Sequence, residues 1–316
     1  MKILIVYYSQ SGNTQKIARA IRDGMRSAGH EVDLRFLRFV SFEDLPHYDM
    51  IGFGAPVWYE MPPNVRRFVE DMPALPGKLA FAFNTHGTLP ALYFPLAIPR
   101  LQRKGLTVLG WKDWYADCFL QTFPEPYFTA GHPDETDLAE ANAFGRAICA
   151  RADAYLAGDT SVVPAAPEPC MSLTHANIAI DHLGGFHNAH GRLVRDPEKC
   201  LWPGCHICMD NCTMGYIDLE LVRFGSFGDA CDDCHGCTYC EMLCPVGAIR
   251  PVVPYEVAAP VGTDTGHTFF AATLRDAEKR GEFRRLLPEE DVGSTTPFYS
   301  VHPDHPRMRP LSFEED

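Results

Sequence analysis

The chain has 316 residues, 46% of them hydrophobic, and a formal net charge of −13, which indicates two ordinary globular domains. It has no apolar run of about 18 residues and starts with an apolar run too short for a signal peptide, so we expect a cytoplasmic protein without membrane insertion. Residues 158–316 carry −12 of the charge. This acidic half disfavours nucleic acid and anionic membranes as partners, and suits either a basic partner surface or simple solubility.

The first 157 residues alternate between strand and helix patterns. Short apolar runs predict strands, and apolar residues at helical spacing predict helices. We expect strands at 2–8, 32–36, 50–54, 79–83 and 106–110, and helices around 17–25, 65–72, 89–104 and 137–156. This order predicts a doubly wound α/β fold with a five-stranded parallel sheet, which binds ligands beyond the carboxyl ends of its strands.

The loop after the first strand is a candidate phosphate site. It consists of Ser9, Gln10, Ser11, Gly12, Asn13 and Thr14. Hydroxyl groups and the free N–H groups of a helix start can donate to phosphate oxygens, and glycine permits close backbone approach. The loop contains no Lys or Arg, which suits a monophosphate better than a nucleoside triphosphate. A helix N-cap built of turn residues is the alternative interpretation.

This loop resembles the phosphate loop of the flavodoxin family, and the resemblance extends over about residues 1–157. Two later loops match that family in position, one after the third strand and one after the fourth. The resemblance implies a flavodoxin-like fold and bound FMN. It also implies flavin ring contacts from Pro56, Val57, Trp58 and Tyr59 on one side and from Asn84, Thr85, His86 and Gly87 on the other.

Two later stretches permit more than one interpretation. The aromatic-rich stretch 111–135 is either a loop packed on the core or on a second domain, or a lid over the flavin. Residues 162–169 form a Pro- and Ala-rich linker. The histidines that follow indicate either a turn-rich segment or a metal site; they are His175, His182, His187 and His190.

Nine of the twelve cysteines lie between Cys200 and Cys244, and such clustering in a chain of this size indicates metal rather than disulfides. The second run has the spacing of bacterial iron–sulfur proteins: Cys234-x2-Cys237-x2-Cys240-x3-Cys244-Pro245. The first run has the same order, with two extra residues after its first cysteine and threonine in place of proline: Cys200-x4-Cys205-x2-Cys208-x3-Cys212-Thr213.

Together the two runs resemble the two-cluster bacterial ferredoxins, which have a small α+β fold. The resemblance implies one [4Fe–4S] cluster on Cys200, Cys205, Cys208 and Cys244, and another on Cys212, Cys234, Cys237 and Cys240. Cys231 is left as a spare thiol. A zinc ribbon fits three successive Cys-x2-Cys steps poorly, and a plant-type [2Fe–2S] cluster leaves most of the second run unused.

We therefore expect four regions. They are a flavodoxin-like FMN domain at 1–158, a linker and leading segment at 159–195, a ferredoxin-like domain at 196–252 and an extension at 253–316. Within the extension, 269–287 has a helical pattern. The last residues, 298–316, are expected to wrap onto the first domain or onto a partner subunit.

A flavin exchanges one or two electrons and a [4Fe–4S] cluster exchanges one, so this combination predicts an electron relay. The chain resembles the flavodoxin–ferredoxin fusions found mostly in anaerobes, which implies a ferredoxin-type donor and a redox enzyme as acceptor. A flavin-dependent reductase of a small molecule and a redox sensor or assembly factor are the alternatives. A homo-oligomer is compatible with the sequence.

Overall fold

The computed structural model describes residues 1–58, 60–118, 125–168, 193–212, 217, 239–251, 263–293 and 308–316. Within these residues, none of the helices combines the length and the apolar character that crossing a membrane requires.

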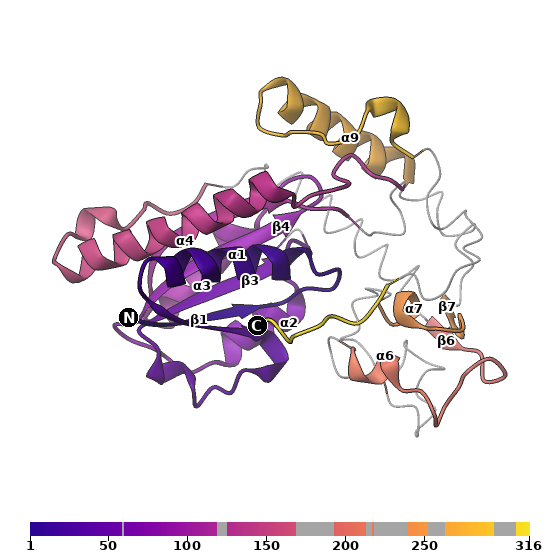
Figure 1. The fold of residues 1–316 in the computed structure, drawn as a ribbon, viewed down its shortest axis with the longest axis horizontal. Helices are drawn as coiled ribbons and strands as arrows, with labels where there is room; N and C mark the ends of the chain where they lie inside the picture. The colour runs from indigo at the N-terminus through magenta and orange to yellow at the C-terminus, as the bar shows by residue number, and fades with distance from the viewer. Residues whose placement is uncertain are drawn as a thin grey trace.

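The N-terminal region forms the expected α/β fold around a five-stranded parallel sheet of order β2-β1-β3-β4-β5 (Figure 1). Its strands are nearly all buried, as expected for a parallel sheet with helices on both faces. The strands are β1 (Lys2–Tyr7), β2 (Glu31–Phe36), β3 (Met50–Pro56), β4 (Leu79–His86) and β5 (Thr107–Tyr115); the helices are α1 (Asn13–Ser27), α2 (Pro63–Asp71), α3 (Tyr93–Arg103) and α4 (Glu135–Leu156).

Helices α1 and α4 pack against each other so closely that glycine is required on both. A Cβ atom at Gly24 would lie 2.0 Å from the carbonyl oxygen of Asn142, and one at Gly145 would lie 2.4 Å from that of Ile21. These contacts hold the C-terminal half of α1 against α4.

The aromatic-rich stretch differs from the expected loop at its start. Strand β5 continues to Tyr115 instead of ending near residue 110, because its second half still pairs with β4. Trp114 is buried on this strand and its ring packs edge-on against Phe144 of α4, with 5.7 Å between the centroids. Residues 119–124 lie outside the described part of the chain.

Further along this stretch, Tyr127 and Phe128 are buried against helix α9 (Thr263–Lys279), where Leu274 is fully buried. The later part of the stretch therefore packs on the C-terminal half of the chain, whereas Trp114 packs on α4. Helix α9 ends at Lys279 and not at the expected residue 287. Gly281, two residues past this end, takes a positive φ of 72°, which is typical of the residues that end helices.

The start of α4 is held by a capping box. The Asp134 carboxylate accepts from the backbone N–H groups of Thr136 and Asp137, while Asp137 accepts from the backbone of Asp134. His132 also bonds Asp137, at 2.6 Å, and the Arg284 carbonyl, at 2.7 Å. These groups satisfy one another and tie α4 to the segment after α9.

The described cysteine-bearing segments contain short elements around an antiparallel strand pair, β6 with β7. Half of their small buried core is cysteine, namely Cys208, Cys240 and Cys244, and the other half is Ile217, Ala248 and Ile249. The elements are β6 (Leu193–Arg195), α6 (Ile207–Asp210), α7 (Tyr239–Leu243) and β7 (Ile249–Pro251); single-turn helices elsewhere are η1 (Leu37–Phe39), η2 (Leu45–His47), η3 (Thr160–Val162) and η6 (Glu289–Asp291).

Residues 308–316, which we call the strap, join the cysteine-bearing segments to the α/β region, as the yellow end of the chain shows in Figure 1. At one end, the Met308 N–H donates to the Met242 carbonyl of α7 at 3.0 Å. At the other, Phe313 packs on Phe36 and Phe39, with ring centroids 5.2 Å from each. The expectation that the tail wraps onto the first domain is confirmed for these residues.

Ion pairs and hydrogen bonds fix the end of the strap on α1. Arg19 pairs with Glu315 and Asp316, each at 2.9 Å, and the Asp316 side chain is only 8% exposed. Tyr7 donates its hydroxyl proton to Asp316. Burial, and then the neighbouring carboxylate, raises the pKa of Tyr7 well above its usual range, so this hydroxyl keeps its proton.

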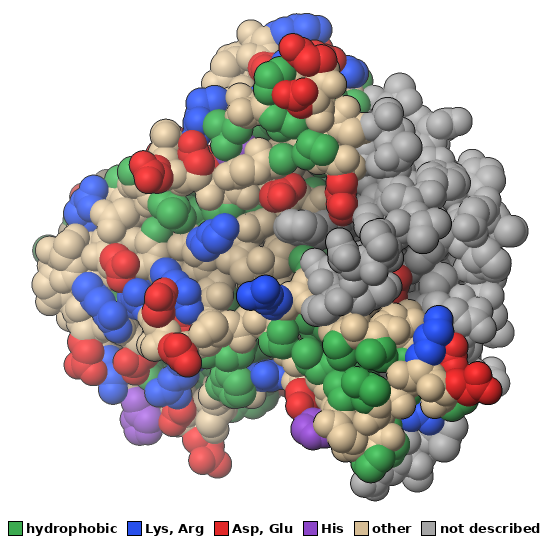
Figure 2. All heavy atoms as spheres, turned by 45° about the vertical axis from the view of Figure 1, so that its right-hand side comes forward, with side chains coloured by type: hydrophobic (Ala, Val, Ile, Leu, Met, Phe, Trp, Pro, Cys, Tyr) green, Lys and Arg blue, Asp and Glu red, His purple; other side chains and the backbone are tan. Residues whose placement is uncertain are grey.

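The face of the molecule in Figure 2 shows acidic and basic side chains mixed over the described surface. No single-sign patch stands out among the described residues on this face.

Candidate functional site

The first site lies at the carboxyl edge of the sheet, where β1 and β3 are neighbours and the strand order reverses. The Tyr8 N–H donates to the Gly54 carbonyl at 2.8 Å, and the Val57 N–H donates to the Thr85 carbonyl at 2.9 Å. These bonds bring the ends of β1, β3 and β4 together, and with them the three loops singled out in the sequence.

The candidate phosphate loop turns at Gly12, whose φ of 91° is one that side-chain-bearing residues rarely adopt. Gly12 donates its N–H to the Ser9 hydroxyl at 3.1 Å, and the Thr14 hydroxyl bonds that of Thr85 at 2.7 Å. Ser9, Asn13 and Thr14 are buried, whereas Ser11 is exposed. Two of the three hydroxyls thus also hold the loop in shape, and that of Ser11 faces outward.

Several polar atoms at this edge are buried without a hydrogen-bond partner among the described residues. They are the Gln10 amide nitrogen, the Asn64 side-chain oxygen, both amide atoms of Asn84 and Nδ1 of His86. Buried polar groups in native proteins almost always have partners. A flat ligand with a polar rim, such as a flavin, fits this set of donors and acceptors.

His86 is held by a carboxylate. Its Nε2 lies 2.9 Å from Asp113 on β5, and its ring packs edge-on against Tyr115, with 4.6 Å between centroids. Burial favours the protonated form of Asp113, but the hydrogen bond and charge of His86 outweigh it, so the pKa of Asp113 lies below its usual range. The buried imidazole is thereby oriented at the edge of the site.

The remaining predicted ring contacts surround the same edge. Pro56, Val57, Trp58 and Gly87 are half-buried. A Cβ atom at Gly87 would lie 2.6 Å from that of Cys118, so this loop packs tightly on the end of β5. Tyr59 lies outside the described residues.

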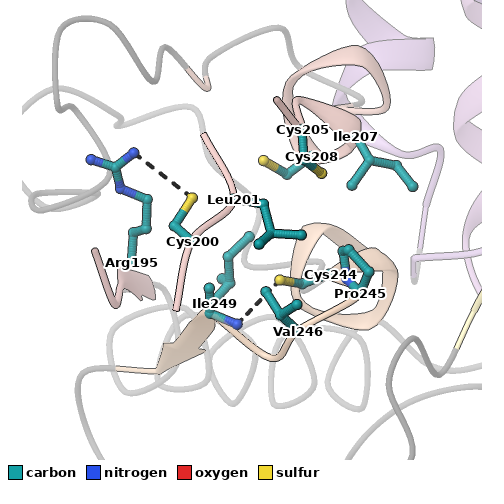
Figure 3. Close-up of a pocket in the computed structure, with 11 residues that line it drawn as sticks. Arg195, Cys200, Leu201, Cys205, Ile207, Cys208, Cys244, Pro245, Val246 and Ile249 are labelled. Carbon is teal, nitrogen blue, oxygen red and sulfur yellow. Dashed lines mark hydrogen bonds between the residues drawn. The ribbon is translucent and has the colours of Figure 1, made fainter. Parts of the chain in front are cut away.

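The second site is a pocket with four cysteines, drawn in Figure 3. Cys200, Cys205, Cys208 and Cys244 all line it, although Cys244 is far from the others in the sequence. The rest of the lining is largely apolar, and two of its members, Leu201 and Val246, are exposed at 53% and 37%. Four thiols in one largely apolar pocket have the chemistry of an iron–sulfur or zinc ligand set.

Local structure explains how these cysteines meet. The Asp196 N–H donates to the Ala248 carbonyl at 2.7 Å, next to the β6–β7 pair, and the Cys200 N–H donates to the Asp196 carbonyl at 3.0 Å. This turn directs Cys200 back toward the strands. The Ala248 N–H also donates to the Cys244 sulfur, at 3.1 Å.

Ionisation of the Cys208 thiol is disfavoured in this pocket. Burial raises the pKa of the Cys208 thiol to about 12, and the nearby sulfurs of Cys244 and Cys200 add to this effect. Four thiolates in one largely apolar pocket, two of them buried, require positive charge beside them. Iron supplies that charge, so the residues present fit a cluster.

The other predicted metal ligands fall elsewhere. Cys212 lines a separate cavity with Tyr8, Ser9 and Tyr239, between the α/β region and the cysteine-bearing segments. Cys240 is buried on α7. Cys234, Cys237 and the spare Cys231 lie outside the described residues, as do His175, His182, His187 and His190.

Three residues at these sites were not identified from the sequence. Asn64 follows Pro62-Pro63 at the start of α2, Asp113 lies on the unexpected second half of β5, and Arg195 lines the cysteine pocket. Only Arg195 has a signal in the sequence: it is a cationic residue that follows the apolar pair Leu193-Val194 and lies five positions before Cys200.

Two family models match parts of the chain. The model described as a flavodoxin domain matches residues 4–90, which contain the phosphate loop. The model described as a 4Fe-4S binding domain matches residues 232–250, which contain the second cysteine run.

Curated relatives match parts of the chain. An uncharacterized protein of Methanocaldococcus jannaschii is 28% identical, with 47% of this chain and 98% of the relative covered. An NAD(P)H dehydrogenase (quinone) of Sinorhizobium fredii is 30% identical, with 34% and 70% covered. A flavodoxin of Aquifex aeolicus is 31% identical, with 27% and 50% covered.

Solved structures match about half of the chain. A flavodoxin from the domain Archaea is 23% identical, with a TM-score of 0.40 and with 48% of this chain and 99% of that chain covered. The flavodiiron protein from Giardia intestinalis is also 23% identical, with a TM-score of 0.39 and with 52% and 38% covered.

Proposed function

Because the N-terminal region of this chain belongs to the flavodoxin-like flavoproteins and residues 232–250 match a 4Fe-4S binding domain, we propose that the chain relays electrons between one FMN and two [4Fe–4S] clusters. Flavins and iron–sulfur clusters both carry electrons, so both parts of the chain point to an oxidoreductase function in electron transport. The relay connects a ferredoxin-type donor to a partner redox enzyme.

In this proposal the first domain, residues 1–158, holds FMN at the carboxyl edge of the sheet. Residues 9–14 bind the phosphate through backbone N–H groups at the start of α1 and through the exposed Ser11 hydroxyl. Asn84 and His86 supply partners for the polar rim of the ring, and Trp58 and Tyr59 cover one of its faces. Bound FMN exchanges one or two electrons.

The second domain, residues 196–252, holds the clusters in the crossed manner of bacterial ferredoxins. One set is Cys200, Cys205, Cys208 and Cys244; the other is Cys212, Cys234, Cys237 and Cys240. The observation that carries the proposal is the convergence of Cys244 with the three cysteines of the first run in one pocket. The crossed ligand assignment requires this convergence, and a zinc site built from Cys-x2-Cys pairs does not.

The contacts between the two regions support an order for the relay. Cys212 lines a cavity that also contains Ser9, the first residue of the phosphate loop. Arg38, just after β2, donates to the Asp210 carbonyl of α6, two residues before Cys212. The cluster on Cys212 then lies nearer the flavin, and the cluster on Cys200 serves the external partner.

Cofactor analysis after anaerobic purification tests the proposal. We expect about one FMN and about eight irons per chain, because two cubanes hold four irons each. Zinc in place of iron, or no more than about four irons in fully loaded protein, would contradict the two-cluster assignment.

A ligand variant separates the two sites. Cys244→Ser is expected to remove about four irons and to leave the FMN content unchanged. Cys149→Ala is the matched control, because Cys149 is a free buried cysteine on α4, away from both sites, and it should keep all the iron. Loss of the flavin together with the iron in Cys244→Ser would contradict independent sites.

A second candidate function follows from the relatives named NAD(P)H dehydrogenase (quinone). In that case a quinone or another small molecule is reduced directly at the flavin. Purified protein supplied with NAD(P)H and a quinone should then turn over without any protein partner. The relay predicts instead that rapid reduction depends on a ferredoxin-type donor.

A further inference from the structure

Among the described residues that line the cysteine pocket, Arg195 at the end of β6 is the one with a cationic side chain. Its Nη1 lies 3.9 Å from the sulfur of Cys200, within hydrogen-bonding range for sulfur, as Figure 3 shows. Arg195 is half-buried. The guanidinium therefore lies beside a predicted cluster ligand and not in bulk solvent.

The position of Arg195 is fixed by the strands. Arg195 pairs with Ile249 in the β6–β7 register, and the turn at Asp196 directs Cys200 back toward it. Within the described part of the chain, no carboxylate lies within ion-pair distance of Arg195. Its charge is thus not neutralised by a described neighbour, and among the described residues its side chain bonds the Cys200 sulfur.

The rest of the lining strengthens the effect of this charge. Leu201, Ile207, Val246 and Ile249 surround the sulfurs, and a charge acts more strongly across an apolar environment than across water. One-electron reduction adds a negative charge to a cluster. Cationic groups and N–H···S hydrogen bonds stabilise that charge and raise the reduction potential.

We propose that Arg195 sets the reduction potential of the cluster held by Cys200, Cys205, Cys208 and Cys244, keeping it higher than these thiolates alone would allow. The inference rests on the proposed function. It assigns to Arg195 the role of raising the potential, and this charge makes the cluster a better electron acceptor than it would be without Arg195.

Three variants test it in the full chain, purified anaerobically and loaded with its cofactors. Arg195→Gln removes the charge and retains a polar side chain. Arg195→Lys keeps the charge but not the planar guanidinium. Lys199→Gln is the matched control, because it removes an equal charge from the exposed residue next to Cys200. The readout is a dithionite redox titration of the cluster signals followed by electron paramagnetic resonance, with iron and flavin content measured alongside.

We expect Arg195→Gln to shift one cluster to a more negative midpoint and to leave the other cluster and both cofactor contents unchanged. At fixed potential, the ratio of reduced to oxidised cluster should fall at least threefold. This corresponds to a midpoint shift of about 30 mV, because a tenfold change in the ratio corresponds to about 59 mV for one electron. Arg195→Lys should shift less, and Lys199→Gln should match the wild type.

Three results would overturn the inference. The first is an unshifted midpoint in Arg195→Gln. The second is an equal shift in Lys199→Gln, which would show that overall charge causes the effect. The third is loss of iron in Arg195→Gln, which would show that Arg195 has a structural role. Absence of cluster signals from the wild-type protein would instead contradict the proposed function, and it is seen before any variant is compared.

Discussion

Thr14 and Ser11 occupy the same loop but differ in what they hold. The Thr14 hydroxyl is buried and bonded to Thr85, whereas Ser11 is exposed and serves no described contact of this kind. We expect Ser11→Ala to weaken FMN binding without loss of stability. Thr14→Val should weaken FMN binding and also cost about 1–3 kcal/mol of unfolding free energy, because the Thr85 hydroxyl loses its partner.

Flavin titration and denaturant unfolding of the two variants check this prediction, with iron content as the internal control. Equal stability loss in both variants would contradict the separation of roles. Loss of iron from either one would contradict independent cofactor sites.

Asp117 gives the stability of the folded chain a pH dependence. Burial raises the pKa of its carboxyl to about 6, with the Glu125 carboxylate adding to the effect. A carboxyl with a raised pKa in the folded state binds its proton more tightly there than in the unfolded state. Its favourable contribution is therefore complete below about pH 4 and is lost as the pH rises through about 6.

Asp117→Asn should remove this loss and stabilise the protein at pH 7 by about 1–2 kcal/mol, since the side chain is partly solvated. Thermal unfolding between pH 4 and 8 measures it, and the exposed Asp71→Asn serves as control. A pH profile that is unchanged in Asp117→Asn would show that other groups set the dependence.

At this scale the sequence identified residue types better than residue roles. The hydroxyl-rich loop and the cysteine spacing were evident, because both patterns are local. The bond between Thr14 and Thr85 and the approach of Arg195 to Cys200 depend on chain crossings that local spacing does not encode. The Thr14–Thr85 bond can be recognised only once the strand order is known. The Arg195–Cys200 approach can be recognised only once the β6–β7 register is known.

Among the elements, the strap makes the clearest prediction. Arg19→Ala leaves the nearly buried Asp316 carboxylate without its cation, which should cost about 1–3 kcal/mol and release the strap from α1. Hydrogen exchange over residues 308–316 should become faster. Arg280→Ala is the control, because that residue is exposed and pairs only with nearby Glu282 among the residues described. Unchanged exchange in Arg19→Ala would mean that the remaining contacts, among them those of Phe313 and the Tyr7–Asp316 bond, are sufficient to hold the strap.

Strand β5 and helix α9 show what limited prediction at the element scale. The sequence placed all five strands, but it ended β5 near residue 110 because Trp111–Tyr115 mixes charged and aromatic residues. Pairing with β4 and packing of Trp114 on α4 overrode that local signal. The bounds of α9 were displaced by several residues, since its apolar pattern is weak at both ends.

At the scale of the whole molecule, the two regions depend on different sources of stability. The α/β region has an extensive aliphatic and aromatic core, whereas half of the described buried core of the cysteine-bearing segments is cysteine. Removing iron with a chelator should therefore unfold the second region and leave the first intact. Limited proteolysis should then leave a stable fragment of about residues 1–158 that still binds FMN. Digestion of that region at the same rate would show that its stability depends on the clusters.

The described pocket takes three of its sulfurs from residues 200–208 and the fourth from Cys244. A growing polypeptide therefore cannot complete this ligand set when the first cysteine run leaves the ribosome, and must wait until Pro245 and the β7 strand have also emerged. On the proposed ligand assignment, this cluster can therefore be assembled only late in biosynthesis, after residues 1–158 have been synthesised.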